Sequence, residues 1–572
     1  MNYNIKSKCL KAVLIGASLF SLNACTDDFD RLNTNPLYPP YEKPSEPGGG
    51  EGEELSPEEI KYLQGIIQES QQIFSKFSYE GVYNDYQRTT SLYHDMYAGY
   101  FAHNKPDFNF TTPNYVYADG WMSRRWEHFY LERCKEYVDM SRAFKHIEPE
   151  KHRNAYYITR IYFAFLGSLM TDTYGPIPFK TFVDGKMPGK EMPYDSQEVV
   201  YDTMFKMLGE AVDSIKVGAP GFKFQGYNDN PYQGDEAKWQ RFANSLRLRL
   251  ALRISNVDPM RAKQEGEAAL SAPGGMISSQ SDNMTTTPLY ALGSGGDENI
   301  HALCSFMWKD MVMAEDIELA YKGLSNGVDE VDPRCKVSWY RPTEYEYLMQ
   351  GEENRRAEYK GSPVGNIDVR HETNVYSVLR CSQSKLDDEK WFGYKRESVW
   401  LGYAETKFLQ AEAALRGWAG ASGTAESLYL DGIRASMEYF KIDAGSIDDY
   451  IRGLYYAGGS NPFKTGDKEK SLEYIITQKW LAIFPNGAEG WAEFRRTDYP
   501  RLQNVALNQS SDVRQGKFIK RIQFPVSEHE YNLANMPEEL KGPKDRQDTR
   551  LWWDVEDTND DGGNRKPANN FR

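Results

Sequence analysis

Apolar side chains recur every three to four residues over most of the chain after residue 57, and this pattern limits the fold more than any other feature. Four such stripes are Ile60, Leu63, Ile67, Phe74 and Phe77; Ile158, Ile161, Tyr162, Phe165 and Leu169; Tyr201, Met204, Phe205, Leu208, Val212 and Ile215; and Trp239, Phe242, Ala243, Leu246, Leu250 and Ile254. Three more are Ala404, Phe408, Ala411, Leu415 and Trp418; Tyr429, Ile433, Met437 and Phe440; and Leu472, Ile475, Ile476, Trp480 and Ile483. This period is typical of helices that pack one face on a core. The sequence therefore predicts a mostly α fold in which helix pairs stack as a solenoid-like array.

The segment from about 272 to 395 interrupts this pattern. Glycine, proline, asparagine and serine cluster there, and β-branched residues occur in short runs such as Val337-Ser338-Trp339-Tyr340. We expect long loops with a few short strands and one helix around Leu303 to Met313. In a helical scaffold, long structured loops are where binding surfaces usually form.

The first 57 residues predict a lipid anchor and a tether. Lys6, Lys8 and Lys11 precede an apolar run over 12–22, which has the length of a signal-peptide core and is too short to span a bilayer. The sequence Leu22-Asn23-Ala24-Cys25 then resembles a bacterial lipobox, which implies cleavage of residues 1–24 and lipidation of Cys25. Residues 25–57 are rich in proline, glycine and glutamate and predict a flexible tether, followed by one domain over 58–572. The alternative is an ordinary secretory signal.

The charge balance argues against nucleic acid as a partner. The chain has 83 acidic and 68 basic residues, a formal charge of -15, which repels polyanions over most of the surface. Arg247, Arg249 and Arg253 do share one side of a predicted helix, but we expect them to be solvated or paired with acidic neighbours. After Leu22 no apolar run approaches the ~20 residues of a membrane helix, so membrane contact is expected through the lipid only.

Metal and disulfide signals are weak. Cys134, Cys304, Cys335 and Cys381 are scattered without a CxxC pair, so their disulfide state stays open. The eight histidines lack metal-ligand spacing. A calcium loop is the one metal candidate, because Asp557, Asn559 and Asp561 precede Gly562, but the twelfth position is Ala568 and lacks the bidentate carboxylate. We expect no cofactor, with calcium as the alternative.

Five stretches, taken together, resemble one known family. They are DTYGPIPF (172–179), KWQRFANSLRLRLALRIS (238–255), YAETKFLQAEAALRGW (403–418), ITQKWLAIFPNGAEGWAEFRRTDYPRL (476–502) and RIQFPVSEHEYN (521–532). Their order and content are similar to the SusD/RagB family of outer-membrane nutrient-binding lipoproteins, and most of all to its SusD-like subgroup. The resemblance implies a SusD-like fold of four tetratricopeptide-type (TPR-like) helix pairs with a loop-rich face that binds nutrient. It also implies a SusC-like TonB-dependent transporter as partner and, with Asp27, Asp28 and Asp30 after the lipobox, exposure at the cell surface.

Candidate ligand residues are aromatic side chains that lie off the helical stripes, because flat rings pack against the C–H faces of sugars. Phe108, Phe110, Tyr115 and Tyr117 lie in one predicted loop, and Trp308, Trp339 and Tyr340 lie in the irregular middle. The alternative for each ring is that it pins a loop to the scaffold. We expect Trp480, Trp491, Arg495 and Arg496 to serve structure instead, with the two arginines as a clasp of bidentate guanidinium contacts.

The sequence favours a binding protein over an enzyme. It contains no HExxH, GxxxxGK[ST] or GxGxxG motif, and we assign no catalytic residues. The leading hypothesis is a surface lipoprotein that binds an oligosaccharide and delivers it to the transporter. The alternatives are a peptide or protein-fragment receptor on the same scaffold, a surface glycoside hydrolase whose carboxylate pair is drawn from the many acidic residues, and a structural adhesin.

Overall fold

A computed structural model describes residues 55–78, 86–103, 105–188, 192–227, 230–288, 299–323, 331–344, 358–367, 375–381, 392–454, 461–555 and 568–571. Residues 57–187 and 193–572 form one compact unit by their contacts, and residues 1–56 and 188–192 are grouped separately. The predicted signal peptide, Cys25 and nearly all of the tether lie outside the described residues. So do the candidate calcium ligands Asp557, Asn559 and Asp561.

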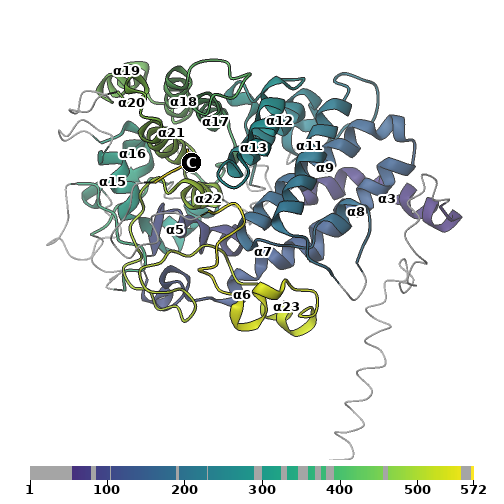
Figure 1. Cartoon of the computed structure of the whole chain (residues 1–572), viewed down its shortest axis with the longest axis horizontal. Helices are drawn as coiled ribbons and strands as arrows, with labels where there is room; N and C mark the ends of the chain where they lie inside the picture. The colour runs from purple at the N-terminus through teal and green to yellow at the C-terminus, as the bar shows by residue number, and fades with distance from the viewer. Residues whose placement is uncertain are drawn as a thin grey trace, which may run out of the picture. The chain divides into compact units, whose positions relative to one another are not determined.

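Helices dominate the described residues, as the apolar stripes predict (Figure 1). The longer ones are α3 (Pro57–Phe77), α8 (Cys134–His146), α9 (Pro149–Tyr174), α11 (Gln197–Ser214), α12 (Glu236–Arg253), α13 (Pro259–Ser271), α15 (Glu315–Gly323), α17 (Tyr403–Leu415), α18 (Ala425–Tyr439), α19 (Ala444–Gly453), α21 (Lys468–Ala482) and α22 (Gly487–Thr497). Shorter ones are α5 (His94–Tyr97), α6 (Asp119–Met122), α7 (Arg124–Glu127), α10 (Lys180–Val183), α14 (Ile300–Ala302), α16 (Pro333–Ser338), α20 (Pro462–Thr465) and α23 (Val526–Tyr531). Single turns of other helix types are η1 (Gln87–Ser91), η2 (Pro106–Phe108), η3 (Thr112–Asn114), η4 (His128–Arg133), η5 (Pro231–Gly234), η6 (Gln280–Asp282), η8 (Leu303–Met307), η9 (Pro342–Glu344), η12 (Glu538–Leu540) and η13 (Gly542–Lys544).

The sequence explains where several long helices begin. Asp235, Asp258 and Asp467 each accept a hydrogen bond from the backbone N–H three residues later, as do Ser196 and Thr424. These side chains satisfy N–H groups that the first helical turn leaves without a partner.

The long helices pack as a continuous array. Along the first part, α3 contacts α8, α8 contacts α9, α9 contacts α11, and α11 contacts α12. The array continues as α12 contacts α13 and α17, while α17 packs on α18 and α21. The core is therefore a layer of side chains between neighbouring helices, and one part of it joins Phe408, Ile433, Met437, Leu472 and Ile476.

Within the described residues, three two-stranded sheets lie beside the array, and all are short and antiparallel. Strand β1 (Phe101–His103) pairs with β3 (Met311–Met313), β2 (Met284–Thr286) pairs with β6 (Ser398–Leu401), and β4 (Trp339–Tyr340) pairs with β5 (Val378–Leu379). The prediction of short strands in the irregular middle is confirmed. The predicted helix from Leu303 to Met313 is wrong at its end, because it stops at Met307 and residues 311–313 form β3.

Several contacts join segments that are far apart in the sequence. The Tyr100 hydroxyl donates a hydrogen bond to the Trp480 carbonyl at 2.6 Å, and the Trp480 indole donates to the Ala98 carbonyl at 2.9 Å. The Gly487 N–H donates to Oδ1 of Asp95 at 3.1 Å. A Cβ on Gly487 would lie 2.4 Å from the Asp95 Cα, so only glycine allows this approach. The segment 86–103 is thus held against α21 and α22.

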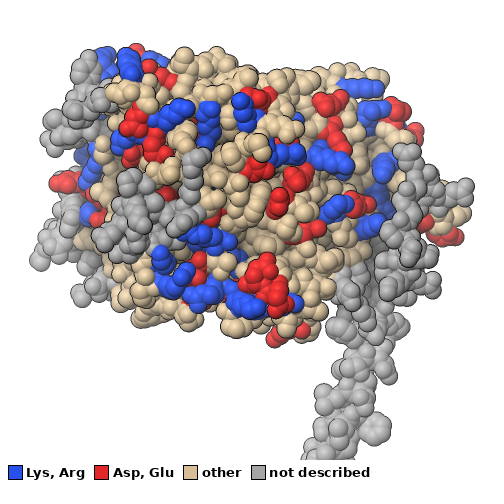
Figure 2. All heavy atoms as spheres, in the orientation of Figure 1, with Lys and Arg blue, Asp and Glu red and all other residues tan. Residues whose placement is uncertain are grey.

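Charged side chains of both signs are intermixed on the described part of the face in Figure 2. In the part of the chain that the structure describes, no helix is both long and apolar enough to cross a membrane.

Candidate functional site

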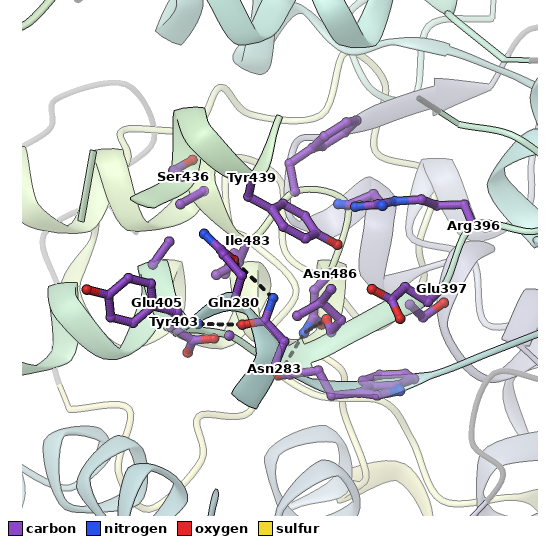
Figure 3. A pocket seen from close by; sticks show the side chains of 18 of the residues that line it. Gln280, Asn283, Arg396, Glu397, Tyr403, Glu405, Ser436, Tyr439, Ile483 and Asn486 are labelled. Carbon is purple, nitrogen blue, oxygen red and sulfur yellow. Dashed lines mark hydrogen bonds between the residues drawn. The ribbon is translucent and has the colours of Figure 1, made fainter. Parts of the chain in front are cut away.

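A pocket opens where the first turn of α17, the end of α18 and the turn between α21 and α22 meet β6 (Figure 3). Its hollow spans about 770 Å³ when the open solvent at its mouth is included. Its aromatic residues are Tyr86, Phe392, Trp400, Tyr403, Tyr439 and Phe484, and its polar ones are Gln280, Asn283, Asn299, His301, Arg396, Glu397, Ser398, Glu405, Ser436 and Asn486.

Asn283 organises one wall of the pocket. Its Oδ1 accepts a hydrogen bond from the N–H of Tyr403 at 2.8 Å, and its amide nitrogen donates to Gln280 at 3.2 Å. The residue before α17 is Gly402, which has no side chain to cap the helix, so Asn283 serves that purpose from another segment. A Cβ on Gly402 would lie 3.3 Å from the Asn283 Oδ1, which explains why glycine suits the position.

Tyr439 and Arg396 form the opposite wall, as Figure 3 shows. The guanidinium carbon of Arg396 lies 4.6 Å from the centre of the Tyr439 ring, a cation–π arrangement. Burial raises the pKa of Tyr439, although Arg396 opposes this, so the side chain stays a phenol at physiological pH. This wall presents an aromatic ring and a positive charge.

The carboxylate of Glu405 at the edge of the pocket is already engaged. It receives two hydrogen bonds from Arg249, at 2.9 and 2.7 Å, and lies 3.4 Å from the Lys479 ammonium. Burial raises the pKa of Glu405 even though both cations oppose the shift. Glu405 therefore ties the pocket to the interior, and it is not a free carboxylate for acid–base chemistry.

Behind the pocket lies a buried ion-pair network. Arg253 pairs with Glu489 at 2.6 Å and with Glu493 at 3.1 Å, and Arg496 pairs with Glu493 at 2.6 Å. Arg496 also forms two 2.7 Å bonds with Glu412. Burial alone raises the pKa of Glu493, but Arg496 and its other cationic neighbours outweigh burial and bring that pKa well below its usual range. These contacts confirm that the basic side of α12 faces acidic neighbours.

The predicted clasp at α22 is confirmed as well. The guanidinium carbon of Arg495 lies 3.5 Å from the centre of the Trp491 ring, and the guanidinium donates hydrogen bonds to the carbonyls of Asp172 and Lys520 at 2.7 and 2.9 Å. It thereby joins α22 to α9 and to the segment around 520.

Three of the predicted ligand residues are buried. Trp339 is fully buried, and its ring centre lies 5.5 Å from those of Phe101 and Phe484. Tyr340 is 7% exposed, with the Arg380 guanidinium over its ring, and Tyr115 is 5% exposed. Their rings lie among protein side chains in this structure.

The other predicted ligand residues reach the surface. Phe110 is 58% exposed, Phe108 and Trp308 are half-buried, and Phe108 packs on Trp121 at 5.8 Å. Tyr117 is half-buried in the wall of a second hollow, which it shares with Phe524, Val526, His529 and Leu533. This hollow lies beside α6 and α23, which are neighbours in Figure 1. Ligand contact by these four residues stays a prediction, and the structure does not bring them into the pocket.

The sequence analysis did not select the residues of the pocket. They come from separate segments, and Asn283, Tyr403 and Asn486 cap or begin helices. One usable signal was Tyr439, an aromatic residue that lies beside the apolar stripe of α18 and not within it.

The described residues contain no group of three or more His, Cys, Asp or Glu side chains that could hold a metal ion. The four cysteines Cys134, Cys304, Cys335 and Cys381 are buried free thiols. The pocket is lined by aromatic rings, amide side chains and hydroxyl-bearing side chains, and such a lining suits a polar molecule with apolar faces.

The match to a family model decides the family. Residues 63–525 match the model SusD-like_2, described as "Starch-binding associating with outer membrane". The chain belongs to this SusD-like family. The SusD/RagB resemblance drawn from the five stretches is thereby confirmed, and so is the mostly helical TPR-like fold.

Solved structures of SusD-like proteins agree with this. A chitin-binding SusD homologue from Flavobacterium johnsoniae is 27% identical, with a TM-score of 0.67 over 87% of this chain and 100% of its own. SusD homologues from Bacteroides vulgatus and Bacteroides uniformis are 26% and 27% identical, each with a TM-score of 0.68 over 86% of this chain and 99% of theirs. A comparison with curated proteins found no match.

Proposed function

We propose that this SusD-like protein is a non-catalytic surface lipoprotein that binds a neutral oligosaccharide and delivers it to a SusC-like TonB-dependent transporter in the outer membrane. The observation that carries the proposal is the family match over residues 63–525, since that family is described as starch-binding and outer-membrane associated. The chitin-binding relative supports a glycan as the ligand class.

The chemistry of the pocket supports the same ligand class. Sugars present C–H faces to aromatic rings and hydroxyl groups to polar side chains. The half-buried ring of Tyr439 supplies a ring face, and the neighbouring Arg396 supplies N–H donors. The cationic Arg396 is balanced by Glu397 in the same pocket, which favours a neutral ligand.

Calorimetry with two defined sugars tests the proposal. The lipid-free protein is titrated with chitotriose and with maltotriose, and with tetra-alanine as a peptide control. We expect at least one sugar to bind and the peptide not to bind. Replacing Tyr439 by alanine should weaken sugar binding about tenfold, because stacking on the aromatic ring is lost.

Tyr531→Ala is the matched control, because Tyr531 is 84% exposed on α23 and does not line the pocket. Its affinity should equal that of the wild type. Binding of the peptide alone would favour the peptide-receptor alternative, and the release of reducing ends from either sugar would overturn the non-catalytic assignment.

The anchor and the partner are tested separately. Cys25→Ser should move the protein from the membrane fraction to the soluble fraction, because lipidation of this thiol is the proposed attachment. Retention in the membrane would contradict the anchor. Co-purification of a TonB-dependent transporter with the affinity-tagged wild-type protein would support the proposed partnership, and its absence under mild detergent would count against it.

A further inference from the structure

Three of the predicted ligand residues that reach the surface lie on neighbouring segments. The loop that carries Phe108 and Phe110 follows β1, and the segment that carries Trp308 leads into β3, the partner of β1. Because the two strands are antiparallel, the end of β1 lies beside the start of β3. An ion pair of 2.7 Å between Lys105 and Asp310 joins the loop and the segment a second time.

Four aromatic side chains reach the surface in this region. Phe110 is 58% exposed, and Phe108 and Trp308 are half-buried. Trp121 on α6 is half-buried as well, and its ring centre lies 5.8 Å from that of Phe108. We call Phe108, Phe110, Trp121 and Trp308 the aromatic patch. None of the four lines the pocket.

Hydrogen bonds hold the backbone that presents Phe110. Its N–H donates to Oδ1 of the fully buried Asn114 at 3.0 Å. The amide nitrogen of Asn114 in turn donates to the carbonyls of Gly365 and Leu507, at 2.8 and 2.9 Å. The loop is therefore anchored to two segments that are distant in the sequence, while the Phe110 ring itself points out to solvent.

The backbone of the patch is strained at two positions. Phe110 and Lys309 have left-handed conformations, with φ of 65° and 55°. Residues other than glycine rarely adopt this conformation, because their Cβ crowds the backbone. Such strain persists where the surroundings impose it, and it clusters at ligand-binding sites. Since the exposed Phe110 ring gains little from packing, a role in binding would explain why a large side chain occupies this position.

The charges beside the patch cancel. Lys105 pairs with Asp310, and Asp107 and Lys309 add one charge of each sign. Aromatic rings in a region without net charge suit the C–H faces of uncharged sugars. The patch therefore matches the neutral ligand class proposed for the pocket.

We propose that the aromatic patch is a second glycan-binding site, which holds a further stretch of the same polysaccharide whose other part occupies the pocket. This inference rests on the proposed function and adds a contact that depends on the length of the glycan. When one chain occupies both sites, the second binding event is intramolecular and the affinity rises. The protein should therefore bind a polysaccharide more tightly than a trisaccharide of the same sugar.

Affinity electrophoresis together with calorimetry tests the second site. The lipid-free protein is run in native gels that contain glycol chitin or amylopectin, and it is titrated with chitotriose and maltotriose. Phe110→Ala should weaken binding of the polymer about tenfold, because the intramolecular contact is lost, and should weaken binding of the matching trisaccharide clearly less.

Two further variants complete the experiment. Phe110→Gly removes the same ring and suits the left-handed backbone, so it tests the patch even if Phe110→Ala folds poorly. Tyr531→Ala is the matched control, because it removes an exposed ring from α23 outside the patch. It should bind the polymer and the trisaccharide like the wild type.

The outcomes separate this site from the proposed function. If the polymer retarded both Phe110 variants as much as a wild type that binds the trisaccharide, the second site would be overturned and the proposed function would stand. Equal losses of affinity for polymer and trisaccharide would also overturn it, because the patch would then not be a separate site. If no sugar of either length bound the wild type, the proposed function and this inference would both fail.

Discussion

Two buried polar regions lie next to each other in this SusD-like protein, and they are built differently. In the network behind the pocket, Arg253 and Arg496 face Glu412, Glu489 and Glu493, so each charge has an opposite partner. At the pocket, the pair of His301 and Asp95 leaves one ring nitrogen without a partner in the described residues. Buried charge alone therefore does not mark a binding site in this fold.

The largest expected loss of stability follows from breaking the ion pairs of Arg496 in the buried network. Arg496→Met should lower the free energy of unfolding by about 5 kcal/mol, the upper end for breaking a buried pair, because two buried carboxylates lose a partner. Urea unfolding of the variant and the wild type measures this loss of stability. Arg434→Met is the control, since the pair of Arg434 and Asp448 is about half exposed and should contribute about 1 kcal/mol or less. If the two substitutions lowered the stability equally, the buried ion pairs of Arg496 would contribute no more than the exposed pair of Arg434.

The second prediction compares Trp308 and Trp339, both of which the sequence analysis selects as candidate ligand residues. Trp339→Ala should cost about 4 kcal/mol of unfolding free energy, because a fully buried indole is removed. Trp308→Ala should cost clearly less, because Trp308 is half-buried. Urea unfolding of both variants, followed by calorimetry with the sugars, tests this. A larger loss of stability in Trp308→Ala than in Trp339→Ala would show that Trp308, and not Trp339, is the more deeply packed ring.

The third effect is the response of the network to acid. The cationic neighbours of Glu412, Glu489 and Glu493 outweigh burial and lower the pKa of all three. A carboxylate whose pKa is lower in the folded state stabilises the protein above its unfolded pKa, about 4.3 for Glu, and this stabilisation is lost as the pH falls further.

We therefore expect the free energy of unfolding to fall by roughly 2 kcal/mol or more between pH 5 and pH 3. Glu405 acts in the opposite direction, because burial raises its pKa. Glu493→Gln removes one of the three groups and should flatten the decline. A stability that does not change between these pH values would show that the network does not depend on ionised glutamates.

The smallest effect concerns the thiols. Burial raises the pKa of Cys134, Cys304, Cys335 and Cys381, which keeps them protonated and unreactive. In a lipid-free protein without Cys9 and Cys25, Ellman's reagent should find no reactive thiol in the native state and all four in urea. Early reaction of Cys304, which follows the pocket residue His301, would show that the pocket region opens more readily than the helical array.

The apolar pattern predicted the helices well, because the residues that form the buried face of one helix lie close together in the sequence. The stripe through Trp239, Phe242 and Leu246 lies on α12, and Gly417 follows the end of α17, where its positive φ suits the turn. Strand β3 was missed because its partner β1 lies some 200 residues earlier in the chain, and no local signal encodes that pairing.

The site was less predictable for the same reason. Trp339 lies in a loop-rich stretch, yet Phe101 and Phe484, both distant in sequence, bury it. Whether an aromatic ring meets ligand or core depends on such distant neighbours. The family resemblance supplied the fold and the class of function, but the pocket residues could be found only once the segments were assembled.

The bond between Tyr100 and Trp480 has a consequence for biosynthesis. The two residues are 380 positions apart, so at a synthesis rate of roughly 5–20 residues per second the early segment waits about 20–80 s for its partner to emerge from the ribosome. During that interval its tyrosines and Asp95 lack the groups that later cover them, and pairing cannot proceed in order along the polypeptide. We therefore expect the early segment to stay exposed until position 480 has been synthesised, and a premature stop codon before that position to yield an aggregation-prone product and not a shorter folded one.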